Sequence, residues 1–304
     1  MIKSEENKKG NYSRNPIIAF LGTVFFPGFG QIYNGQLKKG VLFLSIILIL
    51  PFIYGFTRLP TFFYGFVIIL IIDISFKIYI VYDATATARK IKNYTPKCYN
   101  TWYFNLLFIS IIGVIIWFYE YDKALGIQSF QIPTSTNEPT IKVGDRLIAD
   151  LKAFNNTSPN YGDFVIFQEE DNSLNYSMYR VVGLPGDKIK FENNFLIINN
   201  NKCHITHIKD TLSDGYDVNE YEEELPNGLK HRIYTFTQAH PNNPQKRISQ
   251  ADIPANHYFL LGDNRNNALD SRHIGPVNKD KIKGKIVFGF WGNTKDRINI
   301  NYNN

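Results

Sequence analysis

The sequence has very little cysteine, with only Cys98 and Cys203 among its 304 residues. Two cysteines are too few for a disulfide framework, and they do not make a metal site by themselves. The sequence also lacks an arginine-rich arm, zinc-knuckle spacing and an aromatic nucleic-acid motif. We therefore expect no metal, no cofactor and no nucleic-acid partner.

Long apolar runs are absent from residues 120–304, which are rich in Asn, Lys, Asp and Tyr, and are confined to residues 16–119. This division predicts a membrane half followed by a soluble half. No small-residue cleavage site follows the first apolar run, so we do not expect a cleavable signal peptide. Many lysines and arginines flank the apolar runs, where they meet anionic headgroups, so membrane lipid is an expected partner.

Four apolar segments can be distinguished in the membrane half: residues 16–33, 40–56, 61–82 and 102–119. About 20 apolar residues are needed to cross the core of a bilayer. The first segment is interrupted by Pro27, Gly28 and Gly30. Basic residues precede and follow this first segment, and others lie between the third and the fourth: Lys3, Lys8, Lys9, Arg14, Lys38, Lys39, Arg89, Lys90, Lys92 and Lys97.

Positive charge favours the cytoplasmic side of a membrane, so all of these basic stretches are expected inside. The first segment is then a re-entrant or interfacial element, and the second and third form a helical hairpin. The fourth segment runs outward into Glu120 and Asp122. We therefore predict a multi-pass protein of the cell (inner) membrane, with residues 123–304 on the extracytoplasmic side.

Two further features of the membrane half are open to more than one interpretation. Asp73 and Lys77 have helical i,i+4 spacing within an apolar segment, which suits an ion path or a pair inside a helical bundle. The stretches FPGFGQIYNGQLKKG and YDATATARK resemble glycine-punctuated motifs of small two-helix bacterial membrane modules. A channel or transport module capped by the soluble half is therefore one of the readings that the sequence leaves open.

The soluble half has the pattern of an antiparallel β domain. Short β-branched and aromatic runs alternate with Gly-Asp, Pro-Gly-Asp and Asn-Asn turns. Residues 191–250 are expected to be an insertion into this domain, because their centre is polar. The expected fold is N-terminal transmembrane α-helices plus a mainly antiparallel β domain. The predicted division is a cytoplasmic tail 1–15, a membrane module 16–101, a transmembrane helix 102–122 and a β domain 123–304.

Four stretches of the soluble half carry a family pattern in the same order and spacing: residues 130–145 (FQIPTSTNEPTIKVGD), 161–167 (YGDFVIF), 179–189 (YRVVGLPGDKI) and 262–277 (GDNRNNALDSRHIGPV). Together they resemble the type I signal peptidases. The resemblance implies an antiparallel β scaffold with a substrate groove near the outer membrane face. Members of that family cut signal peptides from exported proteins with a serine nucleophile and a lysine base.

The resemblance also indicates which positions carry the chemistry, and these positions are substituted here. The nucleophilic serine of the family falls at Thr136, the lysine base at Tyr179, and the serine that orients the lysine at Ala268. Thr134 keeps a hydroxyl at the oxyanion position. A structural ion pair of the family falls at two further residues, Asp270 and Arg272.

A tyrosine cannot take over the task of the lysine, because burial acts on the two side chains in opposite ways. Burial disfavours the ammonium, so it lowers the pKa of a lysine from about 10.4 and leaves a neutral amine. Burial also disfavours the phenolate, so a tyrosine keeps its proton. A hydroxyl attacks an amide only when a neighbouring group removes its proton. We therefore predict that Thr136 and Tyr179 are non-functional in catalysis.

The sequence predicts a peptidase-inactive relative that binds exported segments, signal peptides or an envelope protein complex. The alternative is a working signal peptidase with Thr136 as the nucleophile and an unidentified base. A histidine base at His257 or His273 would support this alternative, although neither occupies the position of the lysine. Ser135 as a shifted nucleophile would break the proline spacing of the family.

Overall fold

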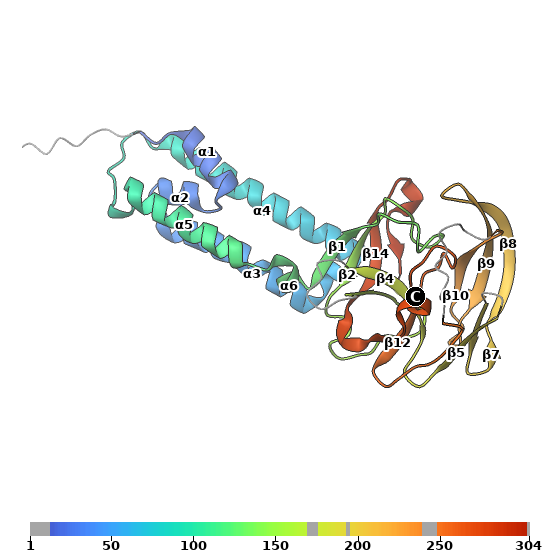
Figure 1. The fold of residues 1–304 in the computed structure, drawn as a ribbon. Helices are drawn as coiled ribbons and strands as arrows, with labels where there is room; N and C mark the ends of the chain where they lie inside the picture. Colours follow the sequence, from blue (N-terminus) through green and yellow to red (C-terminus); the bar gives the residue numbers. More distant parts are fainter. Residues whose placement is uncertain (1–12, 169–175, 193–194, 239–247, 303–304) are drawn as a thin grey trace, which may run out of the picture. The chain divides into compact units, whose positions relative to one another are not determined.

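The structure is a computed structural model that describes residues 13–168, 176–192, 195–238 and 248–302. It divides into two compact units, one formed by residues 1–60 with 64–125 and the other by residues 61–63 with 126–304. We call them the membrane unit and the β unit (Figure 1). Most of the predicted tail 1–15 lies outside the described residues, and the predicted domain boundaries stay predictions.

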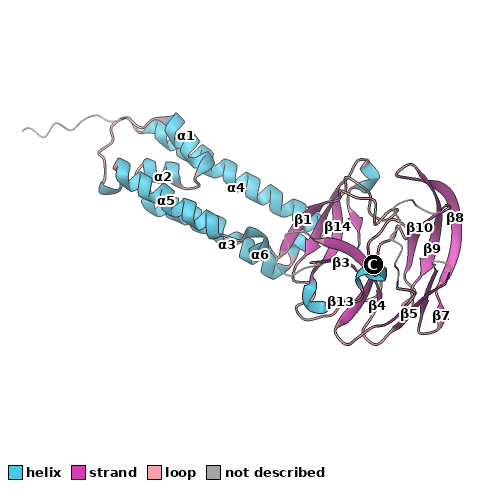
Figure 2. Cartoon of the chain, in the orientation of Figure 1, coloured by secondary structure: helices cyan, strands magenta, loops and turns pink. Residues whose placement is uncertain are grey.

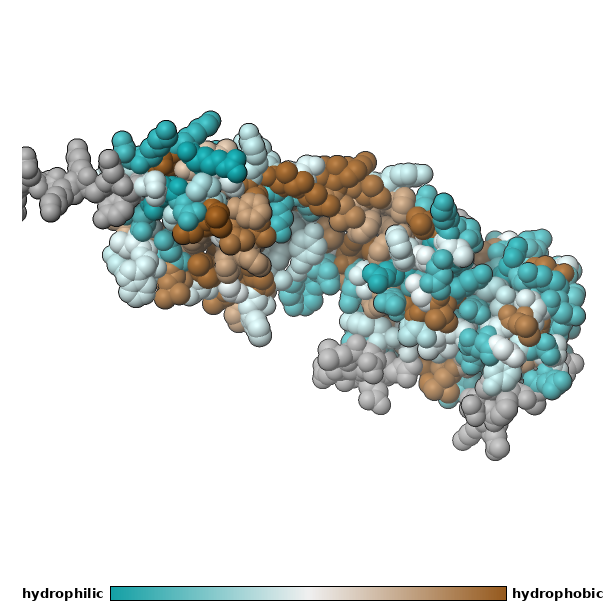
Figure 3. Space-filling view, turned by 90° about the horizontal axis from the view of Figure 1, so that it is seen from above, coloured by the Kyte–Doolittle hydropathy of each residue, from teal (hydrophilic) through white to brown (hydrophobic). Residues whose placement is uncertain are grey.

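The membrane unit is helical (Figure 2). Its helices are α1 (Pro16–Phe25), α2 (Phe29–Tyr33), α3 (Leu37–Thr57), α4 (Phe63–Lys90), α5 (Trp102–Phe118) and α6 (Tyr121–Leu125). Helices α3 and α4 are long and apolar enough to cross a membrane, with 21 and 28 residues. Apolar residues are gathered over the helices in the space-filling view (Figure 3). These helices agree with the prediction of a membrane-inserted half, whereas their orientation stays a prediction.

Local sequence explains where these helices begin and break. The Asn15 side chain accepts a hydrogen bond from the Ile17 amide, and Pro16 occupies the first turn of α1. The predicted interruption of the first segment separates α1 from α2, and Gly28 there has a left-handed φ of 86°. Helix α4 continues to Lys90, so Arg89 and Lys90 are helical rather than part of the connecting loop.

The two glycine-punctuated stretches of the sequence are joined by polar contacts between α2 and α4. The Gln31 side chain donates to the Ile80 carbonyl at 2.8 Å, and the Asn34 side chain donates to the Ala84 carbonyl at 2.7 Å. An ion pair of 2.6 Å joins Lys39 to Asp83. Buried polar groups need such partners in an apolar setting. The polar residues of the two stretches therefore have a structural role, which is to hold α2 against α4.

Asp73 has a partner that the sequence did not indicate. The Tyr54 hydroxyl lies 3.2 Å from the Asp73 carboxylate and donates to it. Among the described residues, no ion pair joins Asp73 to Lys77. The i,i+4 pairing that was one interpretation of these two residues is therefore not formed.

The described residues of the β unit form three antiparallel sheets. The largest has the order β1-β2-β14-β3-β4-β12-β13, with β15 paired to β14. Its strands are β1 (Ile127–Gln131), β2 (Arg146–Asp150), β3 (Phe164–Phe167), β4 (Ser177–Gly183), β12 (His257–Leu261), β13 (Val277–Asn278), β14 (Ile282–Trp291) and β15 (Ile300–Asn301). A short helix, α7 (Ser271–Ile274), lies between β12 and β13 in the chain. The prediction of a mainly antiparallel β domain is confirmed.

The segment predicted as an insertion contains most of the two smaller sheets. One has the order β11-β5-β6-β7, with β5 (Lys188–Glu192), β6 (Phe195–Ile198), β7 (Asn201–Lys202) and β11 (Gln250–Asp252). The other has the order β10-β9-β8, with β8 (His204–Ser213), β9 (Tyr216–Glu224) and β10 (Lys230–Phe236). The polar centre of this segment is therefore a long hairpin, which turns at Asp214 and Gly215, both with positive φ.

A cluster of buried charged side chains joins the β10-β9-β8 sheet to the main sheet; it consists of Arg180, Glu223, His231, Asp263 and Arg265, and we call it the charge cluster. Arg180 of β4 binds Asp263 in a bidentate manner, with contacts of 2.8 and 2.7 Å. Arg265 binds Glu223 of β9 with both terminal nitrogens. Both carboxylates are therefore balanced by guanidinium groups.

His231 of β10 lies inside the charge cluster. Its Nε2 is 3.4 Å from a Glu223 oxygen and 3.9 Å from an Asp263 oxygen. Burial of the imidazole lowers its pKa well below the usual value, and the positive charges of Arg180 and Arg265 lower it further. His231 is therefore neutral in the folded protein at neutral pH.

The neutral state of His231 predicts how stability depends on pH. An unfolded histidine takes up a proton below about pH 6.5, whereas folded His231 does not. The free energy of unfolding should therefore fall by up to about 1.4 kcal/mol per pH unit as the pH drops from 6.5 towards the folded pKa. His231→Gln should weaken this pH dependence, measured as the melting temperature of the whole chain in detergent between pH 7.5 and 5. Exposed His204→Gln is the control, and equal slopes for both variants would contradict the assignment.

The turn at Gly28 predicts a second effect on stability. A Cβ at Gly28 would meet the Gly40 carbonyl oxygen and would also need a left-handed φ, which costs about 1–2 kcal/mol in a residue other than glycine. Gly28→Ala should therefore lower the melting temperature of the detergent-purified protein. Gly113→Ala in α5 is the control, because a Cβ there has open space and alanine favours helix. Equal melting temperatures for the two variants would refute this explanation.

Candidate active site

The position predicted for the general base lies in an apolar part of the main sheet. Tyr179 is on β4, opposite Val165 of β3, and its side chain is buried. It belongs to a hydrophobic cluster that also contains Val165, Phe167, Val181, Tyr258, Leu260, Ala268 and Val277. Its ring centre is 6.0 Å from that of Phe167. Any ionisable group at this position is therefore surrounded mainly by hydrocarbon.

The Tyr179 hydroxyl is directed to a backbone acceptor. It donates to the carbonyl oxygen of Leu269 at 3.1 Å. A carbonyl oxygen only accepts hydrogen bonds, so the phenol carries its proton in this contact. Its arrangement is that of a hydrogen-bond donor rather than of a base.

The predicted nucleophile lies on the loop between β1 and β2. The Thr136 hydroxyl is 3.3 Å from the Thr134 hydroxyl, and either group can be the donor. Across the ranges that the structure describes, no amine, imidazole or carboxylate is hydrogen bonded to the Thr136 hydroxyl. The arrangement therefore supplies a hydroxyl pair without an acceptor strong enough to remove a proton from Thr136.

The three substituted positions come together around Gly262, directly after β12. A Cβ placed on Gly262 would lie 2.5 Å from the Ala268 Cβ, 2.6 Å from the Thr136 carbonyl oxygen and 3.4 Å from Cε1 of Tyr179. No side chain fits into this space. The positions identified from the resemblance are therefore close in space, although they come from three separate parts of the sequence.

Asn264 holds the loop that carries Thr136. Its backbone amide donates to the Thr136 carbonyl at 3.1 Å, and its side chain donates to the Ser135 carbonyl at 3.2 Å. The Asn137 side chain donates to the Met178 carbonyl of β4 at 2.9 Å. These contacts fix the loop against the strand of Tyr179.

Ser135 is an anchor of the same loop, which the sequence analysis did not identify. Its hydroxyl donates to the Asp214 carboxylate and accepts from the Asn267 side chain at 2.8 Å. Ser213, next to Asp214, donates to Glu138 at 2.6 Å. The tip of the β8–β9 hairpin is therefore bound to the loop. The Asp-Gly pair in the sequence indicates the turn, but nothing in the sequence indicates what the turn contacts.

The remaining candidate residues have structural partners. Arg272 binds Asp270 through two contacts of 2.8 and 2.7 Å, and both side chains are buried. Asp270 also accepts from the Gly262 amide at 3.1 Å. Nδ1 of His257 donates to the Ala255 carbonyl at 2.9 Å, and Nδ1 of His273 is 3.8 Å from Asp270. Neither histidine is hydrogen bonded to Thr136 in the described part of the chain.

Comparisons with known proteins identify the family to which this site belongs. The family model described as signal peptidase, peptidase S26, matches residues 100–291, which is more than half of the chain. Signal peptidase I of Buchnera aphidicola (subsp. Schizaphis graminum) is 32% identical over 208 residues, covering 53% of this chain and 66% of the relative. Signal peptidase IB of Staphylococcus aureus (strain MRSA252) is 28% identical over 182 residues, covering 59% of this chain and 85% of the relative.

Among solved structures, a signal peptidase I from Enterococcus faecalis V583 is matched over 97% of its chain and 42% of this one, at 20% identity. Its TM-score of 0.26 is too low to carry a structural argument. The family assignment depends instead on the family model, whose range includes the loop of Thr136, strand β4 and the turn at Gly262. On this basis, the chain belongs to the signal peptidase (peptidase S26) family.

Proposed function

We propose that this protein is a membrane-bound signal peptidase-like protein that lacks Ser/Lys peptidase activity and binds exported segments or an envelope partner. Its β unit lies on the extracytoplasmic side in this proposal, which the distribution of basic residues supports. The curated relatives are named as signal peptidases, and substrates of that class are the first candidates for binding here.

One observation carries the proposal. The Tyr179 hydroxyl donates a hydrogen bond to the Leu269 carbonyl, within a hydrophobic cluster at the position of the family's lysine. A neutral amine at this position would accept a proton from the neighbouring hydroxyl, whereas a phenol used as a donor does not. Loss of general base catalysis alone lowers rates by about 10²–10⁴-fold.

The preserved loop supports a role in binding. The contacts of Ser135, Asn137 and Asn264 keep the loop in one conformation without a nucleophile to position. These contacts stabilise the fold, and they also keep the surface around Thr136 in place. A loop held in one conformation can receive a polypeptide without first being ordered, which supports the proposed role in binding.

The alternative function is cleavage with Thr136 as the nucleophile, and the hydroxyl pair of Thr134 and Thr136 is the observation that favours it. The two functions differ in an assay of the whole chain in detergent with a signal-peptide substrate. We expect no cleavage above the level of Thr136→Ala, because Thr136 has no base. Cleavage that Thr136→Ala abolishes would refute the proposal and establish the alternative.

Restoring the family's residues should restore chemistry. We expect the triple variant Thr136→Ser, Tyr179→Lys and Ala268→Ser to cleave the same substrate at least about 10²-fold faster than the unaltered chain, because a buried amine can act as a base. The double variant Thr136→Ser with Ala268→Ser is the matched control and should stay inactive. If the triple variant is folded but inactive, the tyrosine is not what prevents cleavage.

Binding without cleavage can be measured directly. A fluorescently labelled signal peptide should bind the whole chain in detergent, with fluorescence anisotropy as the readout. Thr136→Trp should weaken this binding, because the indole would occupy the space beside the loop. Thr157→Trp, at an exposed position, is the control. Equal affinity of both variants, or of a scrambled peptide, would contradict binding at this site.

A further inference from the structure

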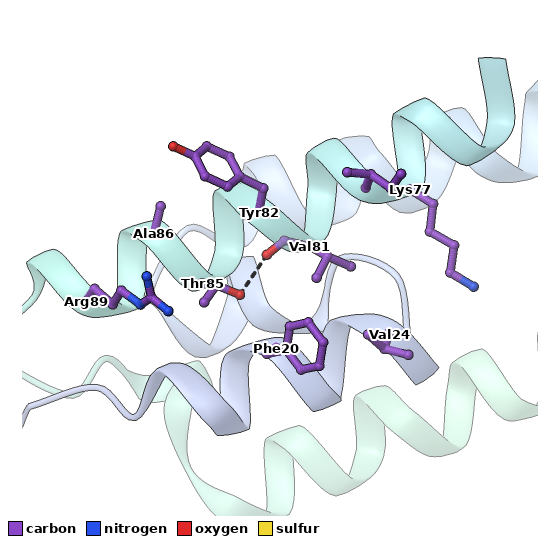
Figure 4. Close-up of a pocket in the computed structure, with 9 residues that line it drawn as sticks. Phe20, Val24, Lys77, Val81, Tyr82, Thr85, Ala86 and Arg89 are labelled. Carbon is purple, nitrogen blue, oxygen red and sulfur yellow. Dashed lines mark hydrogen bonds between the residues drawn. The ribbon is translucent and has the colours of Figure 1, made fainter. Parts of the chain in front are cut away.

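A groove in the membrane unit lies between α1 and α4 and has a volume of about 540 Å³ (Figure 4). Phe20 and Val24 of α1 form one wall, and Val81 and Thr85 of α4 face them. The remaining lining residues also belong to α4: Lys77, Ile78, Tyr82, Ala86 and Arg89. The volume is within the range of about 300–1,000 Å³ that is usual for sites that hold small molecules.

The chemistry of the walls selects an apolar occupant. Most of the lining side chains are hydrocarbon or aromatic, and the hydroxyl of Thr85 is satisfied by the Val81 carbonyl at 2.8 Å. Between Lys77 and Arg89, the lining side chains other than Thr85 and Tyr82 are hydrocarbon. An acyl chain fits this environment, and α4 is one of the two helices long and apolar enough to lie in a bilayer.

The two cationic side chains of the groove lie at different places along α4, so the two ends of the groove differ. Arg89 and Lys77 are 12 positions apart on α4, which is about 18 Å along a helix. Neither makes a hydrogen bond or an ion pair to any other residue that the structure describes. Arg89 is at the last turn of α4, where a membrane helix reaches the headgroup region, whereas Lys77 is near the middle of the helix.

The end of the groove at Arg89 carries further positive charge. The Arg14 amide donates to the Ile91 carbonyl at 3.4 Å, which places the start of α1 beside the end of α4. The Arg14 guanidinium lies over the rings of Tyr33 and Tyr94, at 4.5 and 3.7 Å. Its Nε and one terminal nitrogen are buried without a hydrogen-bond partner among the described residues. Arg14 does not line the groove, but its backbone contact with Ile91 adds a positive charge near the end of α4, where Arg89 lies, and this favours an anion there.

We propose that the groove is a binding site for an anionic phospholipid, with an acyl chain between α1 and α4 and the phosphate at Arg89. A guanidinium presents a fork of donors that matches a phosphate group, and the apolar walls replace the contacts that the acyl chain makes with other lipids. The site depends on the helices lying in a membrane and is independent of the peptidase chemistry of the β unit.

Native mass spectrometry of the whole chain in detergent tests the site, with equal amounts of phosphatidylglycerol and phosphatidylethanolamine that carry the same acyl chains. We expect about a fivefold preference for phosphatidylglycerol, since one basic residue near an anionic membrane surface contributes about 1 kcal/mol. Arg89→Gln should remove this preference. Lys90→Gln removes the same charge from the next position, outside the groove, and should keep it.

Two further variants locate the lipid. Ala86→Trp fills the groove and should reduce binding of both lipids, with the melting temperature as a check of folding. Lys77→Met should keep the preference, because the phosphate lies at Arg89. The proposal is overturned if the two lipids bind equally, if Lys90→Gln or Lys77→Met abolishes the preference, or if the spectra contain a lipid-free dimer in which a second copy covers the groove.

Discussion

The turn at residues 262–265 is the constraint on which the β unit depends, because each of its four residues binds a different part of the chain. Gly262 leaves room for Thr136, Tyr179 and Ala268. Asp263 pairs with Arg180 of β4, and Asn264 holds the loop of Thr136. Arg265 reaches Glu223 of β9. The turn therefore connects the main sheet, the β10-β9-β8 sheet and the candidate site.

This constraint explains how the site keeps its shape while its chemistry changes. The contacts that fix the loop are made by backbone groups and by residues other than the three substituted ones. Replacing a serine by Thr136 or a lysine by Tyr179 does not remove any of these contacts. The aromatic ring of Tyr179 instead packs in a hydrophobic cluster with Phe167 of β3 and Ala268. Scaffold stability and catalysis thus depend on different atoms.

In the membrane unit too, the residues that pack the helices differ from the residues that line the proposed lipid site. Its glycines and buried amides are used to bring α2 against α3 and α4, as the approach of Gly28 to Gly40 and the hydrogen bonds of Gln31 and Asn34 demonstrate. The cations at Arg89 and Lys77 make no hydrogen bond or ion pair with the residues that the structure describes. Unpaired cations beside an apolar groove are costly in a bilayer unless an anion or water compensates them, which is the basis for the inferred lipid site.

The sequence by itself determined the apolar helices, the break at Gly28, the mainly antiparallel β character of the second half and the family positions Thr136, Tyr179 and Ala268. These features follow from local periodicity, turn residues and motif spacing, which are properties of neighbouring residues. It did not reveal the β8–β9 hairpin, because β8 is mostly exposed and the buried positions of β9 include the charged residues Glu220 and Glu223, so neither strand has an apolar alternation. The Ser135–Asp214 contact, the Tyr179–Leu269 hydrogen bond and the Arg180–Asp263 and Arg265–Glu223 pairs of the charge cluster were decided only by the tertiary structure, because each joins residues that are 42 or more positions apart.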